Sequence, residues 1–131
     1  DVWAEGPITQ LGLQVPGFPN LFMVNGPGSP SVLTNMIVSI EHHVGWIADT
    51  LAHLQQSGRT TIEADPDAAE QWGGVVDSIA ELTLLPSCNS WYRGANIPGK
   101  PLRFMPFLGF PMYTELVAQS VADGYRGFVL T

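Results

Sequence analysis

Residues 21–30 read LFMVNGPGSP and lead directly into a long amphipathic segment. The four apolar residues 21–24 lie between two asparagines, a pattern typical of a short buried strand. The glycines and prolines of residues 26–30 exclude helix and predict a turn. The predicted order is therefore a strand, a glycine-rich turn and a helix N-terminus.

The segment after this turn has an apolar residue at every third or fourth position, which predicts one long helix from about residue 33. Ser31 or Thr34 can cap its start, and Ser57 followed by Gly58 predicts its end. The stripe predicted to be buried consists of Leu33, Met36, Ile37, Ile40, Val44, Ile47, Leu51 and Leu54.

A second helix is predicted by Asp65 at the N-cap and Pro66 at the first helical position. Its predicted buried face consists of Ala69, Trp72, Val76 and Ile79. The remaining predicted elements are a short strand at 60–63, a loop at 86–112, a third helix at about 113–122 and an apolar tail at 128–130 that can pair or pack.

The composition is short of charge. Only 13% of the residues are charged, about half of the ~25% usual in soluble domains, and the formal net charge is −7. So few charges indicate that another protein surface covers much of this chain. The acidic balance argues against a nucleic acid partner, and no apolar run reaches the ~20 residues of a membrane span. Cys88 is the only cysteine, which fits a reducing, cytoplasmic location.

The predicted turn is a candidate ligand site. Backbone N–H groups at a helix start lack internal partners and attract negative charge. Gly26 and Gly28 would let a ligand approach the backbone closely. The turn lacks both the G-x-G-x-x-G pattern and the lysine of a phosphate loop, so it suits a partial negative charge, such as a flavin pyrimidine edge, better than a pyrophosphate. By spacing alone, a plain strand-to-helix connection is favoured.

The titratable residues predict neither a catalytic site nor a metal site. His42 and His43 are adjacent, so on a helix they point about 100° apart and cannot share a metal ion. The acidic residues fall on helix starts and solvated faces. We therefore expect no catalytic residue and no metal ligand in this chain.

Four ordered blocks of sequence carry a resemblance to a known family. They are PGFPNLF at 16–22 with GPGSPS at 26–31; SIE at 39–41 with HV at 43–44 and Trp46; SWY at 90–92 with GANIPGK at 94–100; and GYRGF at 124–128. Together they resemble the C-terminal part of flavin-dependent Baeyer–Villiger monooxygenases, in the subgroup of phenylacetone and steroid monooxygenases. The implied fold is α/β, the C-terminal part of a flavoprotein with two dinucleotide-binding domains. Residues 1–58 would end the FAD-binding domain, and residues 59–131 would form a mainly helical extension.

The same resemblance implies the site residues. The residues implied to contact FAD are Met36, Asn35, Gly26 and Pro27, and those implied to line a ketone pocket are Ser31, Val32, Leu33 and Thr34. Spacing alone favours core packing for Met36. Trp91 lies in a loop at about 86–100 that is implied to cover the cofactor, and it would contact NADPH. Without the resemblance, a tryptophan that packs this loop onto the core is favoured.

The implied enzyme uses NADPH and O2 to convert ketones to esters or lactones, and it is active only together with the upstream sequence, its main partner. Two alternatives stay open. One is another flavin monooxygenase of the N-hydroxylating type, and the other is a non-enzymatic helical interaction domain. Residues 107–113 are shorter than the family pattern and carry Pro111, so the resemblance does not define the course of this loop.

Overall fold

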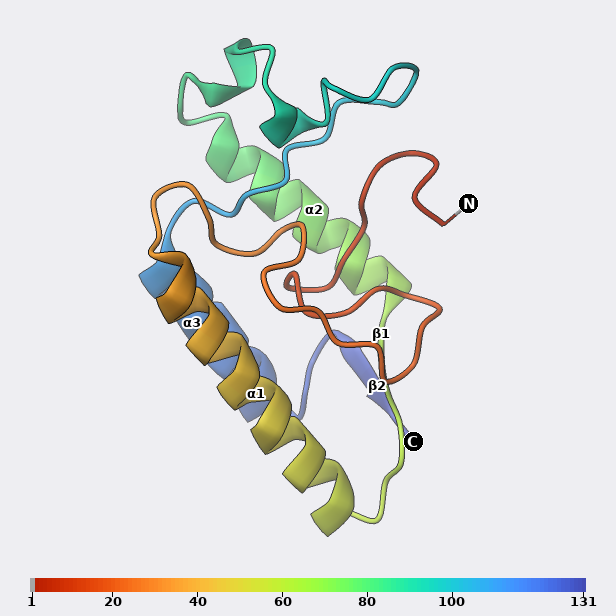
Figure 1. The fold of residues 1–131 in the computed structure, drawn as a ribbon. Coiled ribbons are helices and arrows are strands. Elements are labelled where there is room, and N and C mark those ends of the chain that lie inside the picture. The colour runs from red at the N-terminus through yellow and green to blue at the C-terminus, as the bar shows by residue number, and fades with distance from the viewer. Residues whose placement is uncertain (1) are drawn as a thin grey trace.

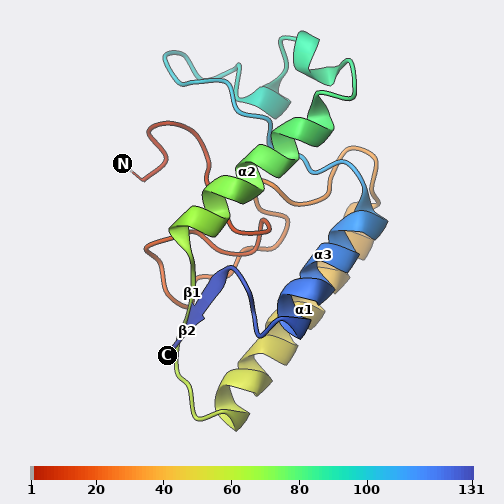
Figure 2. The same cartoon turned by 180° about the vertical axis from the view of Figure 1, so that it is seen from behind.

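The computed structural model describes residues 2–131. Helices α1 (Met36–Gln56) and α3 (Phe110–Ala122) lie side by side and run in the same direction (Figures 1 and 2). Helix α2 (Pro66–Ala80) is connected to both through the irregular N-terminal segment. Trp72 Nε1 of α2 donates to the carbonyl of Gly28, and the N–H of Asn25 donates to His43 of α1. Residues 2–35 therefore join the helices without forming a helix themselves.

Two short strands, β1 (Ile62–Ala64) and β2 (Phe128–Leu130), pair in antiparallel register, with Ile62 opposite Leu130. The predicted tail pairing is thus confirmed, and the predicted strand at 60–63 begins two residues later than expected. Two single-turn 3₁₀ helices, η1 (Leu85–Ser87) and η2 (Trp91–Arg93), lie in the long loop between α2 and α3.

Aromatic rings form the centre of the core. Trp72 of α2 stacks on Phe107, with ring centroids 5.0 Å apart and planes 14° apart. Tyr113 of α3 lies 5.8 Å from Phe107, between ring centroids. Trp46 of α1 packs against Phe128 of β2 at 5.5 Å. All of these rings belong to one hydrophobic cluster, to which each of the three helices contributes.

The prediction for α2 is confirmed in its start and in its buried face. Asp65 is the N-cap, its side chain accepts from the N–H of Ala68, and Pro66 is in the first turn. Trp72 and Val76 are buried as predicted. Helix α3 also lies where expected, but it begins at Phe110, three residues early, because Pro111 is well suited to a first helical turn.

The face prediction for α1 is wrong. The buried residues of this helix are Ser39, His43, Trp46, Thr50 and Leu54. Of the predicted stripe, Ile37 is 67% exposed and Val44 is 51% exposed, and only Leu54 is buried. The helix turns its more polar face toward α3, and residues 2–131 supply nothing to cover its apolar face.

The start of α1 also differs from expectation. Asn35 is the N-cap, and its Oδ1 accepts from the N–H of Ile37 at 3.0 Å. Ser31 and Thr34, the predicted caps, precede the helix, because the chain makes a separate tight turn at residues 31–33. The predicted end is confirmed: Ser57 is the C-cap, and Gly58 adopts φ +68°, the left-handed conformation that glycine tolerates.

The buried strand predicted at residues 21–24 is wrong as well. Only Phe22 forms a β-bridge, to Gln14, and Leu21 and Val24 are 47% and 44% exposed. A strand needs neighbours on its edges, and within residues 2–131 this segment has one bridge. Apolar side chains of this segment are therefore left exposed within residues 2–131.

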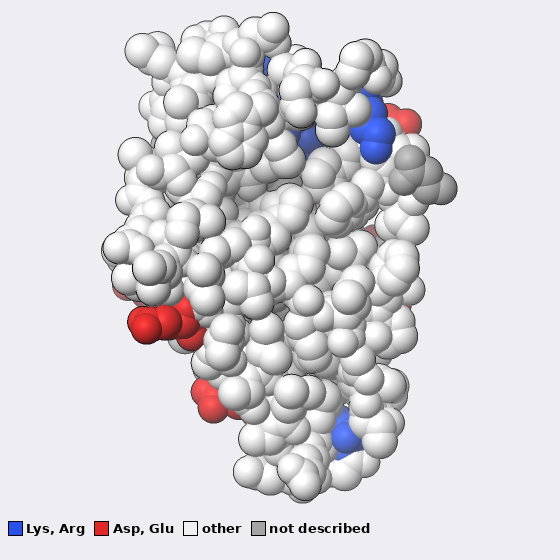
Figure 3. Space-filling view, viewed as in Figure 1, with Lys and Arg blue, Asp and Glu red and all other residues white. Residues whose placement is uncertain are grey.

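The surface carries few charges, as the composition indicates. Figure 3 shows the face over α1 and the N-terminal coil as largely uncharged, with small acidic and basic patches at its edges. Within the described residues, no helix is long and apolar enough to cross a membrane.

Candidate functional site

The N-terminus of α1 is open to a ligand on physical grounds. Its first turn contains no acidic residue that would neutralise the partial positive charge of the helix end. The side chain of Asn35 accepts a hydrogen bond from the N–H of Ile37, and Met36 is 42% exposed. A partly negative group placed at this end would meet unneutralised backbone dipoles.

The residues before the helix form a strained turn. The N–H of Leu33 donates to the carbonyl of Ser31 at 2.7 Å, and Val32 between them has φ +67°. A γ-turn with positive φ is rare, and for a β-branched residue it is strained. Leu33 is 77% exposed. The hydroxyl of Thr34 is buried and lacks a hydrogen-bond partner among the described residues.

The glycines of the turn pack against the chain itself. A Cβ on Gly26 would lie 2.7 Å from the carbonyl oxygen of Gly12. A Cβ on Gly28 would lie 2.9 Å from Trp72 Nε1. The carbonyl of Pro27 accepts from the Thr9 hydroxyl at 2.6 Å. On the side where a Cβ would lie, the space at both glycines is therefore filled by the chain's own atoms and not, as we had expected, by a ligand.

Trp91 lies on η2 and is 63% exposed. Its ring rests on that of Tyr92, with centroids 4.1 Å apart. The backbone of this loop is tied down: the N–H of Met105 donates to the carbonyl of Tyr92 at 2.9 Å, and the N–H of Arg103 to that of Arg93 at 3.1 Å. The indole is thus not a plug in the core but an exposed ring on an anchored turn.

Figure 1 shows η2 beyond the end of α2, well away from the first turn of α1. Asn35, Met36 and the predicted ketone residues 31–34 are thus consecutive at the start of α1. Gly26 and Pro27 pack instead against Gly12 and Thr9, and Trp91 lies in another part of the chain. Among residues 2–131, no three His, Cys, Asp or Glu side chains lie close enough to hold a metal ion.

His43 is a feature that the sequence reasoning missed. It is fully buried, its Nδ1 accepts from the N–H of Asn25 at 3.0 Å, and its Nε2 lies 2.9 Å from the hydroxyl of Tyr113. That hydroxyl donates to the carbonyl of Leu11 at 2.7 Å. The signal in the sequence is the series Ser39, His43, Trp46, Thr50, which also has helical spacing.

Burial, with a smaller contribution from neighbouring His42, lowers the pKa of His43 to about 4. Burial also raises the pKa of the Tyr113 hydroxyl well above its ordinary value. Both groups are therefore neutral near pH 7, which fits a buried hydrogen-bonded pair rather than a proton-transfer site.

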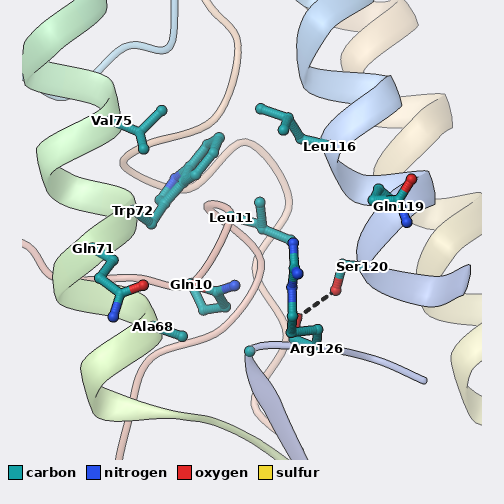
Figure 4. Close-up of a pocket in the computed structure, with 11 residues that line it drawn as sticks. Gln10, Leu11, Ala68, Gln71, Trp72, Val75, Leu116, Gln119, Ser120 and Arg126 are labelled. Atoms are coloured by element: carbon teal, nitrogen blue, oxygen red, sulfur yellow. Dashed lines mark hydrogen bonds between the residues drawn. The ribbon is translucent and has the colours of Figure 1, made fainter. Parts of the chain in front are cut away.

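Two hollows lie away from the predicted site. A cleft of about 490 Å³ lies between α2 and α3. Its lining residues include Gln10, Trp72, Gln119 and Arg126 (Figure 4). An apolar hollow of about 360 Å³ is lined by residues that include Trp3, Phe18 and Leu21. Neither contains a residue predicted to bind FAD, NADPH or ketone.

The chain has close relatives among curated proteins. It is 38% identical over 98% of its length to a Baeyer–Villiger monooxygenase of Pseudooceanicola batsensis and 41% identical, again over 98%, to a cyclohexanone 1,2-monooxygenase of an Acinetobacter species. A phenazine N-monooxygenase of Lysobacter antibioticus is 36% identical over 98% of the chain. The chain spans only 23–24% of these three relatives. No protein-family model matches it.

Solved structures give the same result. An oxidised steroid monooxygenase bound to NADP superposes with a TM-score of 0.88 and 46% identity, over 98% of this chain and 23% of that one. A cyclohexanone monooxygenase from Rhodococcus bound to NADP⁺ superposes with a TM-score of 0.93 and 42% identity, over 100% of this chain and 24% of that one. By sequence and by fold, this chain is thus a relative of one segment of the Baeyer–Villiger monooxygenases.

Proposed function

We propose that this chain is the C-terminal segment of a cytoplasmic FAD- and NADPH-dependent Baeyer–Villiger monooxygenase that converts ketones to esters or lactones. One oxygen atom of O2 enters the ketone, the other leaves as water, and NADPH is oxidised to NADP⁺. The observation that carries the proposal is the match of nearly the whole chain, at 41% identity, to about a quarter of a cyclohexanone monooxygenase.

The remainder of the enzyme is the main partner of this segment. The exposed apolar residues of α1 support this, because a stripe of exposed apolar side chains on a helix marks a surface that another protein surface covers. These residues are Ile37, Ile40, Val44 and Leu51. The exposed strand-like segment at 21–24 supports the same arrangement. We infer that residues 1–58 complete the FAD-binding domain and that residues 59–131 form the helical extension.

FAD binds at the start of α1 in this proposal. The exposed first turn and its lack of acidic residues fit an electron-rich ring edge. Asn35 and Met36 hold this edge through the helix end, and Gly26 and Pro27 shape the turn beside it. When bound, FAD supplies the redox chemistry that passes electrons from NADPH to O2. No side chain of this segment transfers a proton in the reaction.

The ketone lies against residues 31–34. Two observations support this: the strained γ-turn at Val32, since strain concentrates at functional sites, and the buried Thr34 hydroxyl, which has no hydrogen-bond partner among the described residues. Ser31 and Leu33 complete this wall. Trp91 contacts the nicotinamide cofactor, since its exposed indole offers a flat apolar face and one N–H donor. Its loop at 86–100 covers the cofactor and excludes water.

The test uses the full-length polypeptide that contains this segment. We expect a yellow protein with flavin absorbance that oxidises NADPH in the presence of cyclohexanone or phenylacetone and forms the corresponding ester or lactone, detected by mass spectrometry. A colourless protein that binds no added FAD would contradict the proposal and favour a non-enzymatic interaction domain.

N-oxygenation is a second candidate function, favoured by the 36% identity to a phenazine N-monooxygenase. The same assay with phenazine in place of ketone separates the two. An N-oxide product without lactone or ester formation would assign the second function in place of the first.

A further inference from the structure

We propose that His43 is a positioning residue that locks the turn at residues 25–28 onto α1 and so sets the place of the helix end at which, in the function proposed above, the flavin binds. It is buried and two turns along the helix from Asn35. Its hydrogen bonds join α1 to Asn25 of the N-terminal coil and to Tyr113 of α3, and the Tyr113 hydroxyl bonds back to Leu11 of the same coil.

Only one arrangement of protons satisfies all three hydrogen bonds. The backbone N–H of Asn25 can only donate, so Nδ1 of His43 carries no proton. Nε2 therefore carries the proton and donates to the Tyr113 oxygen. The Tyr113 hydroxyl then donates to the Leu11 carbonyl. These three hydrogen bonds together form a relay, and it requires a neutral histidine with its proton on Nε2. No other side chain has two ring nitrogens that can accept one of these bonds and donate the other in the same geometry.

Both ends of the relay hold backbone in the left-handed region. Leu11 and Asn25 each have φ +55°, which is costly for a leucine, whereas asparagine adopts this conformation more readily. Such conformations persist only where the surroundings enforce them. The bond from Asn25 fixes the residue directly before Gly26, and the turn then runs into the residues that precede α1. The relay therefore fixes the path of the chain into the proposed flavin site.

The surroundings keep His43 neutral. The titratable groups that face it are His42 on its own helix, with ring centroids 6.0 Å apart, and Tyr113 on α3, at 5.6 Å. Asn25 and Leu11, from the N-terminal coil, carry no charge. Among these described contacts no carboxylate is present to stabilise a second proton on the ring. The relay is thus intact near neutral pH and broken by protonation of Nδ1.

The test compares matched variants of the full-length enzyme. His43→Asn keeps an acceptor near the position of Nδ1, whereas His43→Gln keeps a polar group near Nε2 and loses that acceptor. His53→Gln, on the same helix, is the control, because His53 has a ring contact with Tyr125 and no part in the relay. One readout is independent of activity: the hydrogen-exchange rate of the Asn25 amide.

We expect His43→Gln to raise the exchange rate of the Asn25 amide at least tenfold and to change the visible circular dichroism of bound flavin. It should also lower the fraction of NADPH consumption that yields product. His43→Asn should restore most of the protection of the Asn25 amide, of the flavin signal and of the product yield. His53→Gln should match the wild type. Equal behaviour of His43→Asn and His43→Gln, at equal thermal stability, would overturn the proposal.

Tyr113→Phe provides a second measurement if His43→Gln does not fold. It keeps the ring and removes the hydroxyl, and we expect faster exchange at Asn25 with a smaller change in the flavin signal. Unchanged exchange would overturn the proposal. A wild-type enzyme without oxygenation activity but with a protected Asn25 amide would instead contradict the proposed function and leave the lock itself in place.

Discussion

Helices α1 and α2 are both amphipathic, yet they use their faces in opposite ways. In α2 the apolar residues Ala69, Trp72 and Val76 are buried, and the exposed side is mainly polar. In α1 the buried residues include Ser39, His43 and Thr50, while Ile37 and Val44 are exposed. The surface that covers the apolar side of α2 is within this chain, whereas residues 2–131 supply no such surface for the apolar side of α1.

The comparison teaches that an apolar stripe predicts burial but not the identity of the surface that buries it. For α2 the covering surface comes from Phe107 and the N-terminal coil. For α1 it comes, in our proposal, from the rest of an enzyme about four times as long. The polar face of α1 is then free to hold specific hydrogen bonds, of which the His43 relay is the clearest.

The largest expected effect lies on the inner face of α2. Trp72→Ala in the full-length protein should cost about 3–5 kcal/mol, because it removes the stack on Phe107 and leaves a cavity. Urea unfolding measures this cost. Trp72→Phe keeps an aromatic ring for the stack but loses the bond to Gly28 and part of the buried ring volume, so a loss of about 1–2 kcal/mol is expected from it. Equal losses for the two variants would contradict the role given to the stack.

The outer face of α1 should respond almost as strongly. Val44→Asp should cost about 3 kcal/mol in the full-length protein, although Val44 is 51% exposed here, because the new charge would be buried without a partner. Val75→Asp on α2, where Val75 is 39% exposed, is the matched control, with a cost of less than about 1 kcal/mol. If the two substitutions cost the same, the claim that the outer face of α1 is covered in the full-length protein and that of α2 is not would be contradicted.

The polar face of α1 should make stability depend on pH. Since the folded state lowers the pKa of His43 from 6.5 to about 4, the unfolded state binds a proton first as the pH falls. Stability is therefore fully present above pH 6.5 and is lost toward pH 4, by about 1.4 kcal/mol per pH unit. Urea unfolding at pH 7 and pH 5 measures this loss, and His43→Gln should reduce it. A flat profile for the wild type would show that this histidine is not buried as a neutral group.

The smallest expected effects are at the helix caps. Asp65→Ala and Asn35→Ala should each cost about 1 kcal/mol, because each removes the side chain that accepts a first-turn N–H. Only Asn35→Ala should also weaken FAD binding, measured by titration of flavin fluorescence. Equal effects of both substitutions on FAD affinity would contradict placing the flavin at α1.

Local signals predicted much of the fold. Asp65 and Pro66 marked the start of α2 because capping and proline preferences act within one turn. Gly58 marked the end of α1 for the same reason. The prediction of a buried strand at residues 21–24 was wrong, because an apolar run forms such a strand only where neighbouring strands exist.

The role of the candidate site is still a prediction, whereas its local geometry comes from the structure. The helix start and the adjoining residues 31–34 are assigned to the site by the turn–helix order and the family resemblance. The γ-turn at Val32 could not be foreseen, since β-branched residues avoid positive φ. The contacts of Gly26 and Gly28 with Gly12 and Trp72 were equally hidden, because they join residues far apart in the sequence.

By itself, the amino-acid sequence determined where the helices form, which residues cap α2, and that the chain is related to flavin monooxygenases. These properties depend on interactions within a few residues or on similarity along the whole chain. Only the tertiary structure decided which face of α1 is buried and that His43, Tyr113, Asn25 and Leu11 share one hydrogen-bond relay. Periodicity defines a stripe on a helix, whereas the choice between two stripes depends on surfaces contributed from elsewhere.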